Sequence, residues 1–83
     1  LPSELPEVLI PRDLMDDGRI EPVKLVRCCG FAGSNGEARR LIEQGGVRVN
    51  DVVIADFAQA TPVADGDVLR VGKRRFAQLR VAR

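Results

Sequence analysis

A segment of seventeen residues, 34–50, constrains the fold more than any other part of the chain. It reads SNGEARRLIEQGGVRVN and combines the signals of a capped helix, a glycine stop and a strand. Ser34 is suited to cap the helix, because Glu37 follows three residues later, as a capping box requires. Gly45-Gly46 predicts the helix end, since glycine adopts the left-handed conformation without a Cβ penalty. The segment therefore predicts one helix followed directly by one strand.

Apolar residues occupy one side of each of these two predicted elements. Ala38, Leu41 and Ile42 follow the i, i+3, i+4 spacing of an amphipathic helix. Val47 and Val49 alternate with polar residues, as in a half-buried strand. We expect Leu41 and Ile42 to be buried between the helix and a sheet. The arginines of the segment then fall on exposed sides: Arg39, Arg40 and Arg48.

The rest of the chain adds a second helix and further strands. Pro22 suits the first position of a helix, which we expect over 23–29 with Leu25, Val26 and Cys29 facing inward. Short runs of β-branched or alternating apolar residues predict strands at 52–54, 68–71 and 77–81, and the pair 50–51 has the length of a tight hairpin turn. These elements predict an α+β fold, with two short helices packed on a small, mostly antiparallel sheet.

Residues 1–21 differ in composition from the rest of the chain. They hold three of the five prolines and have a net charge of −4, whereas residues 22–83 have a net charge of +5. We expect an acidic linker with little core of its own at 1–21, and a folded domain at 22–83. The lack of an initiating methionine and of a signal-like segment suggests a piece of a longer protein. A basic folded part is typical of nucleic-acid-binding proteins.

The segment 34–50 resembles the alpha-L RNA-binding motif, the domain type of ribosomal small-subunit protein four. That family typically reads Ser-x-x-Glu-Ala-Arg-x-Leu-Ile-x-x-Gly-x-Val-x-Val-Asn-Gly. Two positions differ from this pattern. Asn35 stands where a basic residue is common, and Asp51 replaces the usual glycine of the hairpin turn.

The C-terminal part resembles the end of bacterial tyrosyl-tRNA synthetases, through Gly-Lys-Arg-Arg-Phe at 72–76 and also Leu-Pro-Glu-Val at 5–8. This resemblance implies a domain that binds tRNA(Tyr) near its anticodon stem and long variable arm, beside a catalytic domain in cis. Tyrosylation with ATP and magnesium would belong to that catalytic domain, so we expect no catalytic residue, cofactor or metal in this chain. The expected RNA-binding residues are Lys24, Arg27, Ser34, Asn35, Arg39, Arg40, Arg48, Lys73, Arg74 and Arg75.

The aromatic content favours folded RNA over single strands as the ligand. Single-strand binders stack bases on exposed aromatic rings, and we expect the three phenylalanines of this chain to be core residues. Arginines and lysines on a rigid scaffold suit the phosphates and shape of structured RNA. We expect the bases at 73–75 to lie in a loop and to be dispensable for the core. For Arg39, the alternative to RNA binding is an i, i+4 ion pair with Glu43.

Other functional classes find little support. The chain has no histidine and no set of residues for nucleophilic catalysis, and no apolar run approaches the roughly 20 residues that span a membrane. Cys28 and Cys29 are adjacent, and we expect free thiols in a reducing cytoplasm and a monomeric domain. Two alternatives stay open: the same RNA-binding module from a pseudouridine synthase or ribosome-associated protein, and a protein-interaction domain for an acidic partner.

Overall fold

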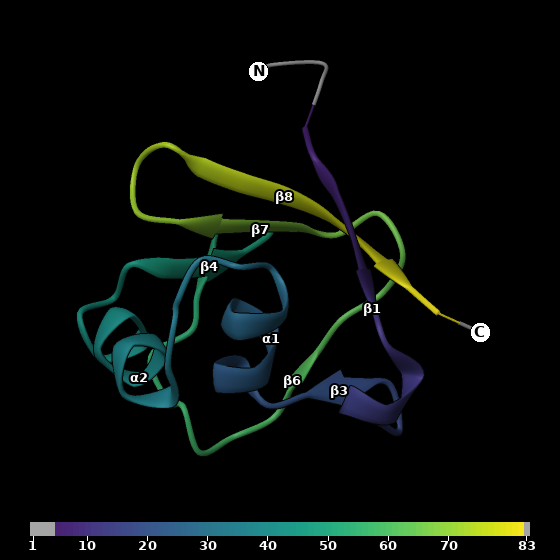
Figure 1. Ribbon diagram of the computed structural model, residues 1–83, viewed down its shortest axis with the longest axis horizontal. Coiled ribbons are helices and arrows are strands. Elements are labelled where there is room, and N and C mark those ends of the chain that lie inside the picture. The colour runs from purple at the N-terminus through teal and green to yellow at the C-terminus, as the bar shows by residue number, and fades with distance from the viewer. Residues whose placement is uncertain (1–4, 83) are drawn as a thin grey trace.

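The computed structural model describes residues 5–82, and the strands of this part of the chain form two sheets. Figure 1 shows both helices beneath the larger sheet, whose strand β1 crosses in front of β8 in this view. The elements in chain order are β1 (Glu7–Ile10), η1 (Arg12–Leu14), β2 (Met15–Asp16), β3 (Arg19–Ile20), α1 (Pro22–Cys28), α2 (Asn35–Glu43), β4 (Val47–Val49), β5 (Val52–Val53), β6 (Thr61–Pro62), β7 (Val68–Val71) and β8 (Arg75–Val81).

The larger sheet has five strands in the order β1-β8-β7-β4-β5. All neighbouring pairs are antiparallel except β1 and β8, which run parallel. The smaller sheet is antiparallel, with the order β2-β3-β6. Its last strand lies within the long connection between β5 and β7. The expected α+β arrangement of two helices on a mostly antiparallel sheet is therefore confirmed.

The core lies between the helices and one face of the larger sheet. Successive strand residues point to opposite faces, and the inward set is fully or almost fully buried. From the helices, Leu25, Val26, Ala38 and Ile42 are completely buried against it. The strand residues of the core are Ile10, Val47, Val49, Leu69, Val71, Ala77 and Leu79.

Both helices begin as their sequence signals predict. Pro22 occupies the first turn of α1, and the Ser34 Oγ accepts a hydrogen bond from the backbone N–H of Glu37 at 3.2 Å. Gly45 follows α2 with a φ of +74°. Ile42 is completely buried, whereas Leu41 is only half-buried at the margin of the core. The expectation of burial is thus confirmed for Ile42 and only in part for Leu41.

The β4–β5 hairpin has its tight turn despite the lack of glycine. Asn50 and Asp51 have φ values of +51° and +68°, as a type I′ turn requires. The Asn50 side chain anchors the turn to the next strand: its Nδ2 donates to Asp67 Oδ1 at 2.9 Å, and its Oδ1 accepts from the N–H of Val68 at 3.0 Å. These two hydrogen bonds attach the β4–β5 turn to the start of β7.

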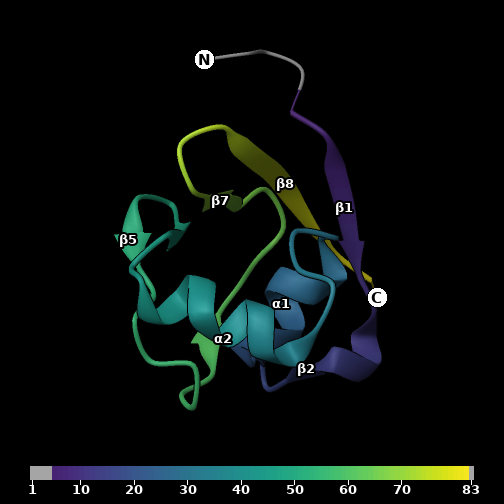
Figure 2. The same cartoon turned by 60° about the vertical axis from the view of Figure 1, so that its left-hand side comes forward.

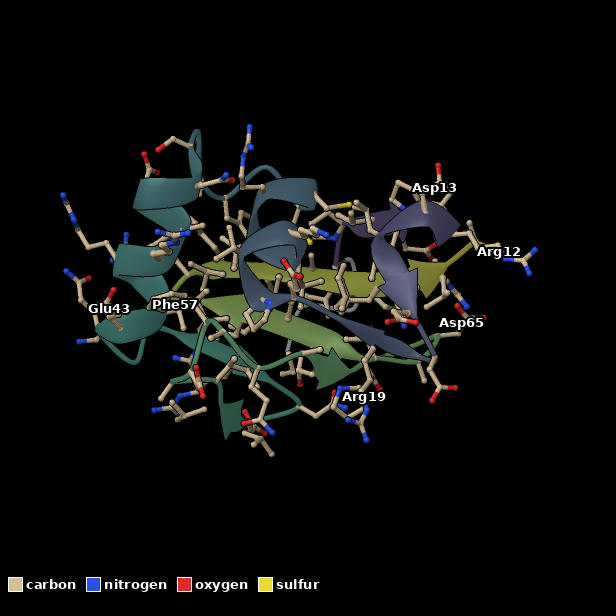
Figure 3. All side chains as sticks on the ribbon, turned by 90° about the horizontal axis from the view of Figure 1, so that it is seen from below. Arg12, Asp13, Arg19, Glu43, Phe57 and Asp65 are labelled. Atoms are coloured by element: carbon tan, nitrogen blue, oxygen red, sulfur yellow. The ribbon has the colours of Figure 1, made fainter. Side chains whose placement is uncertain are left out.

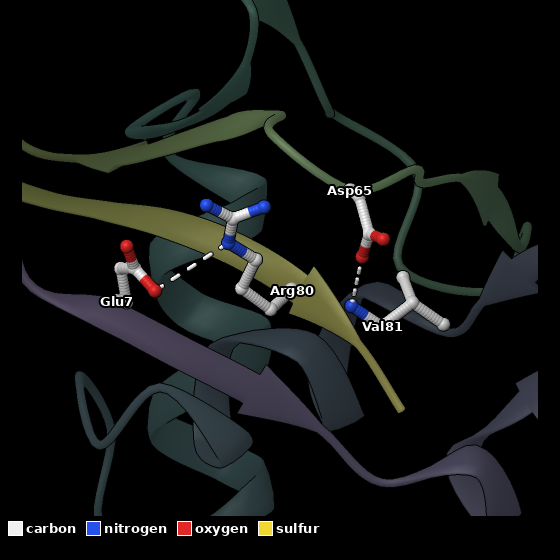
Figure 4. Close-up of polar contacts among 4 residues, drawn as sticks. All are labelled: Glu7, Asp65, Arg80 and Val81. Atoms are coloured by element: carbon white, nitrogen blue, oxygen red, sulfur yellow. Dashed lines mark hydrogen bonds and ion pairs between the residues drawn. The ribbon is translucent and has the colours of Figure 1, made fainter. Parts of the chain in front are cut away.

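The expectation that residues 1–21 form a linker with little core of its own is wrong for the part that the structure describes. β1 pairs with β8, and Ile10 and Ile20 are both buried, at 0% and 1% exposure. Figure 4 shows the ion pair that ties Glu7 to Arg80, with 3.4 Å between Oε2 and Nε. The acids and prolines within residues 5–21 lie at exposed positions, so the composition of this segment hides the few apolar residues that enter the core. The first four residues of the expected linker lie outside the described residues.

Candidate RNA-binding surface

A shallow groove runs over the exposed sides of α1 and α2. Figure 2 shows the two helices packed next to each other. The groove combines three of the expected cationic residues with one expected amide. Its lining residues are Glu21, Val23, Lys24, Arg27, Asn35, Arg39, Phe57 and Ala58.

The cations of this groove are held by neutral or weak partners. Arg27 Nη1 donates to Asn35 Oδ1 at 3.0 Å, which links the end of α1 to the start of α2. Lys24 Nζ lies 3.7 Å from Glu21 Oε2, in an ion pair that is about half exposed on both sides and is therefore weak. Asn35, which stands where a basic residue is common, thus fixes the direction of Arg27.

Arg39 is placed by an aromatic ring and forms no ion pair with Glu43 among the described residues. Its guanidinium carbon lies 5.3 Å from the centroid of the Phe57 ring, within the range of a cation–π contact. Phe57 belongs to the irregular connection after β5 and lies next to α2 (Figure 3). Its ring orients Arg39 without neutralising the charge, so the cation stays available to an anion.

The two other expected residues on α2 have different surroundings. Ser34 is exposed, but its hydroxyl oxygen caps the helix, so its first role is structural. Arg40 is exposed on the side of α2 away from the core, does not line the groove, and has no side-chain partner within residues 5–82. Its charge can therefore reach an RNA that lies along the outer side of α2.

The turn between β7 and β8 adds two free cations, Lys73 and Arg74, both exposed. The N–H of Gly72 donates to the carbonyl of Gly46 at 2.7 Å, which fixes this turn beside the end of α2. The expectation that all three bases of 73–75 lie in a dispensable loop is wrong for Arg75, since it begins β8. Its Nη1 donates to the carbonyl oxygen of Phe31 at 3.1 Å, a tertiary contact to the α1–α2 connection.

Arg48 lies on a different surface from the groove. Its neighbours Val47 and Val49 are buried beneath the helices, so the Arg48 side chain points from the opposite face of the sheet. The cross-strand neighbour of Arg48 on that face is Arg70. The ten expected residues are therefore divided between the helix side with the β7–β8 turn and the outer face of the sheet.

Sequence analysis missed three residues of these surfaces, Phe57, Phe76 and Arg70. Phe57, expected in the core, packs on it with one side and carries Arg39 on the other. No periodic pattern surrounds it, so no local signal could have placed it. Arg70 alternates with the buried Leu69 and Val71, and this spacing would have been enough to predict its place on the outer face, where it is half-buried. The expectation of a core position holds in part for Phe31, which packs half-buried against the core. It is wrong for Phe76, which lies half-buried on the outer face of the sheet opposite Arg70.

No group of three His, Cys, Asp or Glu side chains within residues 5–82 is arranged to hold a metal ion. Cys28 and Cys29 are free thiols. The pKa of Cys29 is raised to about 12, mainly by burial and to a smaller extent by the nearby Cys28. Burial also raises the pKa of Cys28. No helix in the described part of the chain is long and apolar enough to cross a bilayer.

Comparison with known proteins identifies the class to which this fold and surface belong. The S4 domain family matches residues 24–69, which include most of α1, all of α2, the β4–β5 hairpin and the start of β7. The chain belongs to the S4 domain family.

The chain is also similar to one kind of larger protein over nearly all of its length. It is 42% identical over 83 residues to a tyrosine–tRNA ligase of Syntrophotalea carbinolica, covering 96% of the chain and 19% of that protein. It is 39% identical over 79 residues to the tyrosine–tRNA ligase of Moorella thermoacetica, covering 95% and 18% respectively. With the enzyme of Gluconobacter oxydans it shares 42% identity over 82 residues, covering 94% and 20%. The chain spans about a fifth of the length of these relatives and corresponds to their C-terminal S4-like region, which is not the catalytic part.

Proposed function

We propose that this S4 domain binds tRNA(Tyr) through the α1–α2 groove and the β7–β8 turn, as the C-terminal domain of a tyrosine–tRNA ligase. The observation that carries the proposal is the groove itself, in which Lys24, Arg27 and Arg39 line one depression. The similarity to tyrosine–tRNA ligases over nearly the whole chain supports this parent over a pseudouridine synthase or a ribosome-associated protein.

The chemistry of the groove suits a phosphate backbone better than base edges. Its cations belong to two short helices, and the two arginines are held by Asn35 and Phe57. Such fixed charges match a fixed spacing of phosphates, because guanidinium groups bind phosphate oxygens in bidentate geometry. The selectivity for one tRNA would then come from the shape of the folded RNA. We place the anticodon stem and the long variable arm of tRNA(Tyr) on this surface.

The remaining parts of the proposal concern the parent protein. The ATP- and magnesium-dependent tyrosylation would take place in a catalytic domain in cis, with no catalytic residue, cofactor or metal supplied by this chain. We propose a monomeric state for the isolated domain and a cytoplasmic location, which the two free cysteines support. The isolated chain should form no tyrosyl-adenylate when mixed with tyrosine, ATP and magnesium.

A footprint on RNA tests the proposed ligand. The 83-residue chain is bound to a bacterial tRNA(Tyr), and backbone cleavage is compared with that of the same tRNA carrying a shortened variable arm. We expect protection at the anticodon stem and the long arm, and weaker binding of the shortened RNA. Equal affinity for both RNAs, with protection confined to other regions, would contradict the proposed tRNA contact.

A further inference from the structure

The face of the five-stranded sheet opposite the helices carries two arginines side by side. Arg48 on β4 and Arg70 on β7 are cross-strand partners. Both alternate with core residues, so both side chains point away from the helices. Directly opposed residues have Cβ atoms about 4.5–5.5 Å apart, and like charges at that spacing repel. An anion placed between the two guanidinium groups would remove this repulsion.

No carboxylate in the described part of the chain neutralises this pair. Glu7, on the same face, is engaged with Arg80 at 3.4 Å (Figure 4). Asp51 lines a small depression together with Arg70, but no ion pair joins the two. Arg48 is exposed and forms no hydrogen bond or ion pair with its side chain within residues 5–82. The pair therefore consists of an exposed and a half-buried arginine, and no described carboxylate compensates either charge.

The guanidinium of Arg70 is already oriented for a ligand. Its carbon lies 5.5 Å from the centroid of the Phe76 ring, and its Nε donates to the carbonyl oxygen of Gly72 at 3.1 Å. These contacts leave the two terminal nitrogens free, and the fork of an arginine matches the oxygens of a phosphate. The Phe76 ring is half-buried on the same outer face, where part of it can meet a nucleic-acid base.

We propose that the outer sheet face, defined by Arg48, Arg70 and Phe76, is a second RNA-contact surface that binds a backbone phosphate. This inference rests on the proposed function, since one RNA would reach both surfaces. The β7–β8 turn supports a continuous path, because only Gly72 separates Lys73 and Arg74 from the strand that carries Arg70. The hydrogen bond from Arg75 to Phe31 joins the start of β8, next to this turn, to the α1–α2 connection. A folded RNA that wraps around this turn can therefore contact both faces.

The test measures tRNA(Tyr) binding to the 83-residue chain by fluorescence anisotropy over a salt series. The variant is Arg48→Gln with Arg70→Gln, and its match is Arg12→Gln with Arg19→Gln. The matched pair removes the same charge from exposed sites at the end of the molecule away from α2 (Figure 3). We expect the outer-face variant to lose about tenfold or more in affinity and to flatten the salt slope by about 1–2. The matched variant should change both quantities much less.

Several outcomes would overturn the proposal. One is an equal loss of tRNA affinity in the two double variants, which would show that only the net charge of the chain matters. Another is an outer-face variant with unchanged affinity and slope, while loss of Arg27 and Arg39 still weakens binding; this would leave the proposed function standing. A third uses poly-L-glutamate as a probe: if the outer-face variant loses poly-L-glutamate binding but keeps its tRNA binding, the face would be assigned to an acidic protein segment.

The single variant Arg48→Gln, which breaks no contact, should show about half of the effect on the salt slope.

Discussion

Truncation of Ile10 tests whether the N-terminal segment belongs to the folded domain. Ile10 is completely buried on β1, and its carbonyl accepts a hydrogen bond from the N–H of Ala82 at 3.0 Å. Isoleucine-to-alanine changes in cores cost about 2–5 kcal/mol. Because β1 is an edge strand that can relax toward the cavity, we expect Ile10→Ala to cost about 2–3 kcal/mol. That is a large fraction of the roughly 4–12 kcal/mol available to a domain of this size.

Leu9→Ala is the matched variant, because the neighbouring Leu9 is 63% exposed on the same strand. Its cost should stay within about 0.5 kcal/mol, as for most surface changes. In thermal unfolding followed by circular dichroism, Ile10→Ala should lower the Tm by roughly 10–20 °C, and Leu9→Ala by a few degrees at most. Equal melting temperatures for the two variants and the wild type would show that β1 does not pack on β8 in solution.

Two further predictions concern the β4–β5 turn and the cysteines. Asp51→Gly should raise the free energy of unfolding by about 0.5–1 kcal/mol, because it relieves a positive φ. Asn50→Gly should lower the free energy of unfolding, because two hydrogen bonds are lost. Urea titration of both variants measures the sign of each change. Alkylation by iodoacetamide at pH 8 should modify Cys28 before Cys29, because the pKa of Cys29 lies near 12 and the thiolate is the reactive form. The pKa of Cys29 is higher in the folded than in the unfolded state, where it is about 9. The free energy of unfolding should therefore fall as the pH rises from about 9 toward 12, and Cys29→Ser should reduce this fall.

Local signals were sufficient for most elements of this fold. The Ser34 cap, the glycine stop after α2 and the alternation around Val47 each depend on residues a few positions apart, and the structure has all three. The β1–β8 pairing could not be predicted in this way, because its partners lie about 70 residues apart and β1 is masked by acids and prolines.

The candidate site was predictable in its residue types more than in its geometry. Helix and strand periods correctly placed Arg39, Arg40 and Arg48 at exposed positions. Their division between two surfaces depends on the packing of α2 on one face of the sheet, which no local pattern encodes. The contact between Arg39 and Phe57 joins a helix to an irregular connection, so only the folded structure reveals it.

The most direct test of the account is the salt dependence of tRNA(Tyr) binding when the groove loses two cations. The variant Arg27→Gln with Arg39→Gln is compared with Arg12→Gln plus Arg19→Gln, which has the same net charge. If the domain neutralises about five phosphates, log affinity should fall with log salt at a slope of roughly −4, and the groove variant should flatten it by about 2. A groove variant that stays folded, with an affinity and slope equal to those of the matched variant, would contradict the claim that the α1–α2 groove binds the RNA.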